Sequence, residues 1–161
     1  MRRTALVALA IVALSLAGCG FVVVHTAKKA YRELTKDEHD IGYALNRYRV
    51  LVTQGDFDKA AEMFDEGAEL SHQGQSPVVG REAIRTFLSS FKGYKVIEYE
   101  LEASSTSATG TKGKQEGTYH QKVVSPEGKA IEVRGSFQAE WNQQPGGAWL
   151  IHRLHTSASV E

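Results

Sequence analysis

The chain has 161 residues, and its 19 Lys and Arg are balanced by 19 Asp and Glu, so its formal net charge is zero. This length suits one domain with a real core and is too short for two ordinary domains. Because no basic stripe stands out from the balanced charge, the sequence excludes nucleic acid as an expected partner.

The N-terminal segment has the composition of a secretory signal peptide. Arg2 and Arg3 provide a basic start, and residues 5–16 are apolar. Ala17 and Gly18 are the small residues that a peptidase requires immediately before its cut. This pattern predicts at least that the chain is secreted.

The quartet Leu-Ala-Gly-Cys at residues 16–19 also resembles the bacterial lipobox. The resemblance implies that the Cys19 thiol receives a diacylglycerol, that the bond before it is cut, and that the new amino terminus is acylated. We therefore predict a signal peptide over residues 1–18 and a lipoprotein of the bacterial cell envelope that faces outside the cytoplasm. Gly20 stands where an aspartate would favour retention in the inner membrane, so the outer membrane is favoured in a diderm organism.

An uncleaved membrane helix is the alternative for this segment. Residues 4–24 carry no charge and reach the roughly 20 residues that a bilayer core requires. Both readings tether the domain to a membrane through a connector over residues 19–34. If Cys19 is lipidated, no thiol remains for a disulfide, a thiolate metal site or a cysteine nucleophile.

Three helices are predicted before the main run of strands. Thr35 and Glu38 have the spacing of a capping box, which predicts a helix over residues 36–53. Asp56 caps a short second helix, along which we expect the apolar side chains of Phe57, Ala60, Ala61 and Phe64 to share one side. A brief strand over residues 66–72 and a polar loop follow. The apolar spacing then predicts a third helix over residues 81–91, with Phe64 and Phe87 both buried.

From Tyr94 onward the apolar pattern changes to a period of two, which predicts strands. Residues 104–114 are rich in Ser, Thr and Gly and predict either a weak edge strand or a mobile hairpin. Residues 118–125 and 129–141 predict a hairpin, and residues 148–156 a last strand. In the middle strand one face is apolar, comprising Ile131, Val133, Phe137, Ala139 and Trp141. We expect an α+β domain with three helices packed on one face of a mainly antiparallel sheet.

Four segments in this order resemble the nuclear transport factor 2-like superfamily, and in particular its SnoaL-like members. They are residues 54–58 after the first helix, residues 80–84 at the start of the third, residues 134–137 and the closing run 147–157. The resemblance covers residues 35–158. It implies a cone with cystatin-like topology, in which a strongly curved sheet and three helices enclose an apolar cavity. Since the superfamily contains both enzymes and non-catalytic binding domains, the fold does not determine the function.

Tyr48 lies eight residues before Asp56, where ketosteroid isomerases of this superfamily carry their oxyanion-hole tyrosine. The resemblance implies that its phenol donates a hydrogen bond to a developing enolate in a dry cavity. The alternative is that Tyr48 belongs to the apolar stripe of the first helix and has its hydroxyl satisfied locally.

His72 lies near the position of the isomerases' aspartate base. Its imidazole has an ordinary pKa of about 6.5 and so suits proton transfer near neutrality, although isolated histidines beside loops are commonly structural. Phe137 aligns with the isomerases' second oxyanion donor and cannot donate, which argues against that chemistry. Tyr48, His72 and Phe137 are the side chains expected in the ligand pocket.

The remaining histidines do not predict a metal site. His152 and His155 lie three apart on one expected strand, so we expect them to point to opposite faces, and no carboxylate pair accompanies them. His120 completes these candidates. No glycine-rich loop precedes a helix in the manner of phosphate-binding loops. We therefore expect neither metal nor cofactor.

Two functions of different classes remain open. The first is a membrane-tethered module that binds a small apolar ligand, or pairs with a protein partner or with a second copy through its sheet, without catalysis. The second is a cofactor-free isomerase, dehydratase or cyclase-type enzyme with His72 as base and Tyr48 as donor. The missing donor at position 137 favours binding.

Overall fold

A computed structural model describes residues 33–159, and Thr35 opens the compact unit that holds the fold. The signal peptide and the lipidation of Cys19 concern residues outside this described range. Within residues 33–159, no helix is both long and apolar enough to cross a membrane.

Three helices pack against the sheet, as expected: α2 (Lys36–Thr53), α3 (Phe57–Glu62) and α4 (Arg81–Ser89). The capping box of α2 is formed, because the Thr35 hydroxyl accepts from the Glu38 amide and the Glu38 carboxylate accepts from the Thr35 amide at 2.8 Å. Along α2 the residues spaced for one face, Ile41, Leu45, Tyr48 and Val52, are all buried. The capping box and the apolar spacing therefore predicted the longest helix within residues 33–159 correctly.

The six strands form one sheet in the order β2-β1-β6-β5-β4-β3. Their bounds are Phe64–His72 for β1, Val78–Val79 for β2, Lys95–Thr109 for β3, Lys112–Val124 for β4, Ala130–Gln143 for β5 and Trp149–Ala158 for β6. Only the β1–β6 pair is parallel. This confirms an α+β fold with helices packed on a curved, mainly antiparallel sheet.

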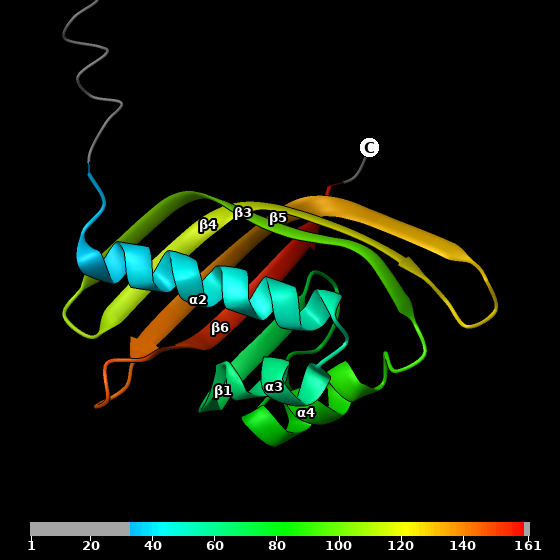
Figure 1. Cartoon of the computed structure of the whole chain (residues 1–161), viewed down its shortest axis with the longest axis horizontal. Helices are drawn as coiled ribbons and strands as arrows, with labels where there is room; N and C mark the ends of the chain where they lie inside the picture. The colour runs from blue at the N-terminus through cyan, green and yellow to red at the C-terminus, as the bar shows by residue number, and fades with distance from the viewer. Residues whose placement is uncertain (1–32, 160–161) are drawn as a thin grey trace, which may run out of the picture. The chain divides into compact units, whose positions relative to one another are not determined.

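The sheet bends around α2, which lies across one of its faces, whereas α3 and α4 lie together beside β1 (Figure 1). Register shifts interrupt the β3–β4 and β5–β6 pairings, and such bulges bend strands locally. At Gly113 of β4, an added Cβ would lie 2.4 Å from the Ile41 Cδ1, so α2 packs directly on the strand backbone there.

Three expectations about element boundaries were wrong or incomplete. Phe64 opens β1 instead of lining the second helix, and it is fully buried. The third helix ends at Ser89, two residues early, and Phe87 is only partly buried. The weakly patterned residues 104–114 form a hairpin, because pairing with β4 as far as Thr109–Lys112 satisfies the backbone groups on one side of the edge strand β3.

The apolar face expected on the middle strand divides into two parts. Phe137, Ala139 and Trp141 of β5 are at most 2% exposed and belong to the core. Ile131 is exposed and Val133 is half-buried, so the start of β5 lies beyond the packed region. One end of the covered sheet face is therefore left open.

Candidate functional site

The open end of the domain contains an apolar hollow with a wide mouth and a narrow inner end. The mouth has a volume of about 400 Å³, and its walls include Ile131, Val133 and Tyr119. The inner end has a volume of about 60 Å³ and reaches Tyr48 and Tyr99. The two regions share the following residues: His72, Phe87, Phe91, Tyr94, Gln121, Val123 and Thr156. The two regions therefore adjoin each other along these shared residues, and we refer to them together as the hollow.

The wall of this hollow carries no fixed charge. None of the described residues that line either part is Asp, Glu, Lys or Arg. Aromatic side chains are concentrated in the wall, including the contacting pairs Phe87–Phe91 and Phe91–Tyr94. A neutral aromatic wall favours apolar ligands, since a charged group moved into it would lose water without gaining a counter-ion.

Tyr48 comes from α2 and is 2% exposed at the inner end of the hollow. Its ring packs edge-on against Phe64, with the ring centroids 5.5 Å apart, and against Tyr99 at 6.2 Å. Burial raises the pKa of Tyr48 to about 12, and the neighbouring Tyr99 hydroxyl offsets part of this rise. Tyr48 is therefore both a core residue and a neutral polar group on the wall.

His72 is the last residue of β1 and lies half-buried beside the mouth. Its Nδ1 hydrogen-bonds with the Thr156 hydroxyl of β6, the strand partner at the same register position. Burial, and secondarily the neighbouring His155, lowers the pKa of His72 below its ordinary value of 6.5. The ring is consequently neutral at pH 7 and a weaker base than a free histidine.

Phe137 does not line the hollow, contrary to expectation. It is 1% exposed and belongs to the core. Val133 on the same strand reaches the mouth, but Phe137 lies four residues, or about 13 Å of strand, further along. The structure therefore brings Tyr48 and His72 to one hollow and leaves Phe137 outside it.

Tyr99 and Gln121 are two of the polar wall residues that the sequence pattern did not predict. They are register partners on β3 and β4, and the Gln121 side-chain oxygen accepts a hydrogen bond from the Tyr119 hydroxyl at 2.6 Å. The Tyr99 and Tyr119 rings lie 6.3 Å apart. The alternation of residues along the strand predicts that Tyr99 lies on the covered face of the sheet. It does not predict which residues of the neighbouring strands lie beside Tyr99.

The other described histidines lie outside the hollow. His152 contacts Asp65 at 2.9 Å, whereas His155 lies between the Ser71 and Ser157 hydroxyls at 2.9 and 3.1 Å. They share no partner and do not form a common site. His120 alternates with the wall residues Tyr119 and Gln121 along β4, so its side chain points to the outer face of the sheet.

Comparisons with known proteins agree with this geometry. A family model described as SnoaL-like domain matches residues 45–150. No curated protein matches the sequence significantly.

Several solved structures share the fold. A ketosteroid isomerase-like protein from Erwinia carotovora atroseptica aligns with a TM-score of 0.70 and 13% identity over 80% of this chain and 100% of its own. An NTF2-like superfamily protein from Salmonella enterica serovar Typhimurium aligns at 0.66 and 16% over 78% and 92%. An NTF2-like protein with a cystatin-like fold from Novosphingobium aromaticivorans aligns at 0.61 and 19% over 76% and 82%. At these identities the likeness establishes the fold alone.

Proposed function

The chain belongs to the SnoaL-like domain family, and from this premise we propose that it is a membrane-tethered envelope lipoprotein that binds a neutral, apolar small molecule without transforming it. The binding proposal rests on the composition of the hollow. None of the described residues that line it is Asp, Glu, Lys or Arg. The tether rests on the lipobox resemblance at Cys19.

The dimensions of the hollow support a ligand with a body and one slender end. The inner end, about 60 Å³, offers the volume of about two water molecules in the liquid. The mouth, about 400 Å³, has room for a molecule of one or two rings between Phe87, Phe91 and Tyr94. The body of the ligand therefore belongs in the mouth, with only a small group directed toward Tyr48.

Three features favour binding over catalysis. The lowered pKa of His72 weakens it as a base, and the pKa of Tyr48, raised to about 12, makes its hydroxyl a weaker hydrogen-bond donor. Phe137, at the position of the isomerases' second donor, cannot donate and lies outside the hollow. These features leave an enolate intermediate with little stabilisation.

A cofactor-free isomerase, dehydratase or cyclase-type activity remains the second candidate. One observation favours it, namely that a potential base, His72, and a potential donor, Tyr48, line the same hollow. In that scheme His72 removes a proton from the substrate, and Tyr48 donates a hydrogen bond to the oxygen on which charge develops.

The two predicted partners, a second copy of the chain and a small apolar molecule, are not equally well supported. The outer face of the sheet carries paired charges, such as Arg153 with Glu69 and Glu140, and Lys122 with Glu132. A homodimer formed across this face would have to bury these ion pairs, and burying charges is costly. The homodimer stays a prediction, and the small-molecule ligand is the partner that we propose.

Photo-crosslinking with benzophenone and its carboxylate, 4-benzoylbenzoate, tests the binding proposal. The full-length chain would be held in lipid nanodiscs, and adducts would be mapped by peptide mass spectrometry after irradiation. We expect benzophenone adducts in residues 87–96 and 119–123, and at least about tenfold less labelling by the carboxylate, because the wall offers no counter-ion.

Val123→Trp is the matched variant for this experiment, because Val123 lines both parts of the hollow and an indole there would obstruct it. We expect it to abolish the mapped adducts while its circular dichroism spectrum stays that of the unmodified chain. Equal labelling by both probes, or labelling that survives this substitution, would contradict the proposal.

A further inference from the structure

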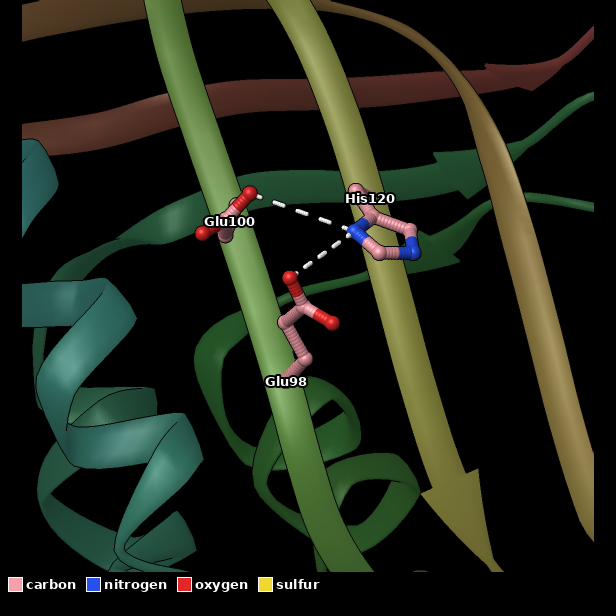
Figure 2. A group of neighbouring side chains, drawn as sticks. All are labelled: Glu98, Glu100 and His120. Carbon is pink, nitrogen blue, oxygen red and sulfur yellow. Dashed lines mark ion pairs between the residues drawn. The ribbon is translucent and has the colours of Figure 1, made fainter.

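We propose that Glu98, Glu100 and His120 form a divalent transition-metal site, specific for Zn²⁺ over Mg²⁺, on the outer face of the sheet. Figure 2 shows both carboxylates directed toward the imidazole from the neighbouring strand. The His120 Nδ1 lies 3.3 Å from Glu98 Oε1 and 3.9 Å from Glu100 Oε2. This site lies on the opposite face from the hollow and is independent of the proposed ligand.

The backbone holds these three side chains together. Glu100 of β3 and His120 of β4 are register partners, and Glu98 lies two residues earlier on the same face of β3. One potential ligand atom from each residue lies within 4.8 Å of the others. Ligands bound at about 2.0–2.2 Å to a tetrahedral Zn²⁺ are about 3.4 Å apart, so small side-chain rotations are enough to close the site.

A fourth residue orients the imidazole. The other ring nitrogen of His120, Nε2, lies 3.0 Å from Glu132 Oε1, which also accepts from Arg134 at 2.8 Å. Arg134 donates two hydrogen bonds to the same Glu132 oxygen, at 3.2 and 2.8 Å, and so holds this carboxylate where it can accept the Nε2 proton. A carboxylate bound to the far nitrogen is the usual way in which a metal-binding histidine is fixed in its tautomer.

That hydrogen bond leaves the Nδ1 lone pair of a neutral His120 facing two carboxylates. Lys122 and Arg134 contact Glu132, whereas His120 is the ion-pair partner found for Glu98 and Glu100 among residues 33–159. A positive charge at Nδ1 would offset the repulsion between this lone pair and the two carboxylates, and a metal ion can supply that charge. The two carboxylates that converge on one nitrogen suit a divalent ion better than a proton, because a single N–H donates well to only one of them.

The donor set determines the class of metal. One imidazole nitrogen with two carboxylate oxygens suits Zn²⁺, whereas Mg²⁺ and Ca²⁺ prefer oxygen ligands alone. The His120 side chain is 12% exposed, and those of Glu98 and Glu100 are 40% and 48% exposed. An ion can thus reach the site from solvent and complete its coordination with water.

Isothermal titration calorimetry of the full-length chain with ZnCl₂ tests this proposal. The chain would carry no histidine tag, would be stripped with a chelator, and would be held in phosphatidylcholine nanodiscs, with empty nanodiscs as the blank. We expect saturable 1:1 Zn²⁺ binding, no comparable heat with MgCl₂, loss of binding in His120→Ala, and at least tenfold weaker binding in Glu100→Gln. Glu102→Gln, two residues further along the same face, is the matched control and should bind normally.

Nitrogen NMR of the His120 ring distinguishes a metal from a proton. Zn²⁺ coordination should shift Nδ1 and leave a proton on Nε2, where Glu132 accepts it. Absence of saturable binding, equal losses in Glu100→Gln and Glu102→Gln, or a Nδ1 proton that persists at saturating Zn²⁺ would overturn the proposal.

Discussion

At the scale of single residues, burial decides the protonation of the two polar groups expected in the pocket. Desolvation disfavours charge, so it raises the pKa of Tyr48 and lowers that of His72. Both groups are consequently neutral at pH 7, which keeps the hollow uncharged. The two side chains to which the family resemblance assigned catalytic roles thus have properties that suit the binding of a neutral molecule.

The lowered pKa of His72 predicts a pH dependence of stability. The unfolded chain, with an ordinary His pKa of about 6.5, binds the proton more readily than the folded chain does. The free energy of unfolding should therefore be highest above pH 6.5 and should fall as the pH drops toward the lower folded-state value. Urea unfolding at pH 7.5 and 5.0 would measure this loss.

His72→Gln is the control for this dependence, because glutamine keeps a polar side chain toward Thr156 but does not titrate. We expect the variant to lose less stability between the two pH values than the unmodified chain. Identical losses in both proteins would show that His72 is not responsible.

At the scale of elements, close approach of strand backbones sets strict limits on side-chain size. Gly117 of β4 faces the irregular pairing near Ala103 of β3, where an added Cβ would lie 1.9 Å from the Glu102 carbonyl oxygen. Since a backbone atom cannot move aside as a flexible side-chain tip can, this position tolerates only glycine. Such a constraint belongs to the β3–β4 pair and to neither strand alone.

Gly117→Ala should therefore destabilise the fold by about 1–3 kcal/mol, the usual cost of overpacking. Gly67→Ala in β1 is the matched control, because an added Cβ at Gly67 meets nothing within 4 Å. That variant should change stability by no more than about 0.5 kcal/mol. Chemical unfolding of both variants measures the difference, and equal effects would refute the close approach at Gly117.

At the scale of the whole molecule, the proposed tether would restrict the binding domain to a membrane surface. Two acyl chains, each with about 0.8 kcal/mol per buried methylene, would hold the protein at the bilayer effectively permanently. A binding protein held in this way meets apolar molecules where they are most concentrated. The neutral wall of the hollow and the predicted lipid anchor are therefore consistent with one role in the envelope.

Cys19→Ala tests the tether directly. We expect this variant to lose labelling by a clickable palmitate analogue and to keep its signal peptide uncleaved or be mislocalised, because no thiol remains to receive lipid. Cys19→Ser offers a comparison with a closely similar side chain that also lacks the thiol. Labelling that persists in either variant would contradict lipidation at Cys19, and membrane retention without labelling would favour the uncleaved helix.

Local pattern alone determined much of this protein. The capping box and apolar spacing located α2 to the residue, and strand alternation identified the α+β class and the covered face of β5. These features depend on interactions between residues a few positions apart, so the sequence alone is enough to predict them. The family resemblance in addition predicted that Tyr48 and His72 face a cavity.

Only the tertiary structure decided which distant residues meet. Phe64 belongs to a strand because its side chain is buried in the core there, and residues 104–109 are paired because β4 supplies their hydrogen bonds. The pairing of Tyr48 with Tyr99, the exclusion of Phe137 from the hollow, and the convergence of Glu98 and Glu100 on His120 likewise depend on strand register and helix docking. Strand register and helix docking depend on contacts between residues that are far apart in the sequence. Because these contacts form only when the whole chain packs, no local periodicity in the sequence predicts them.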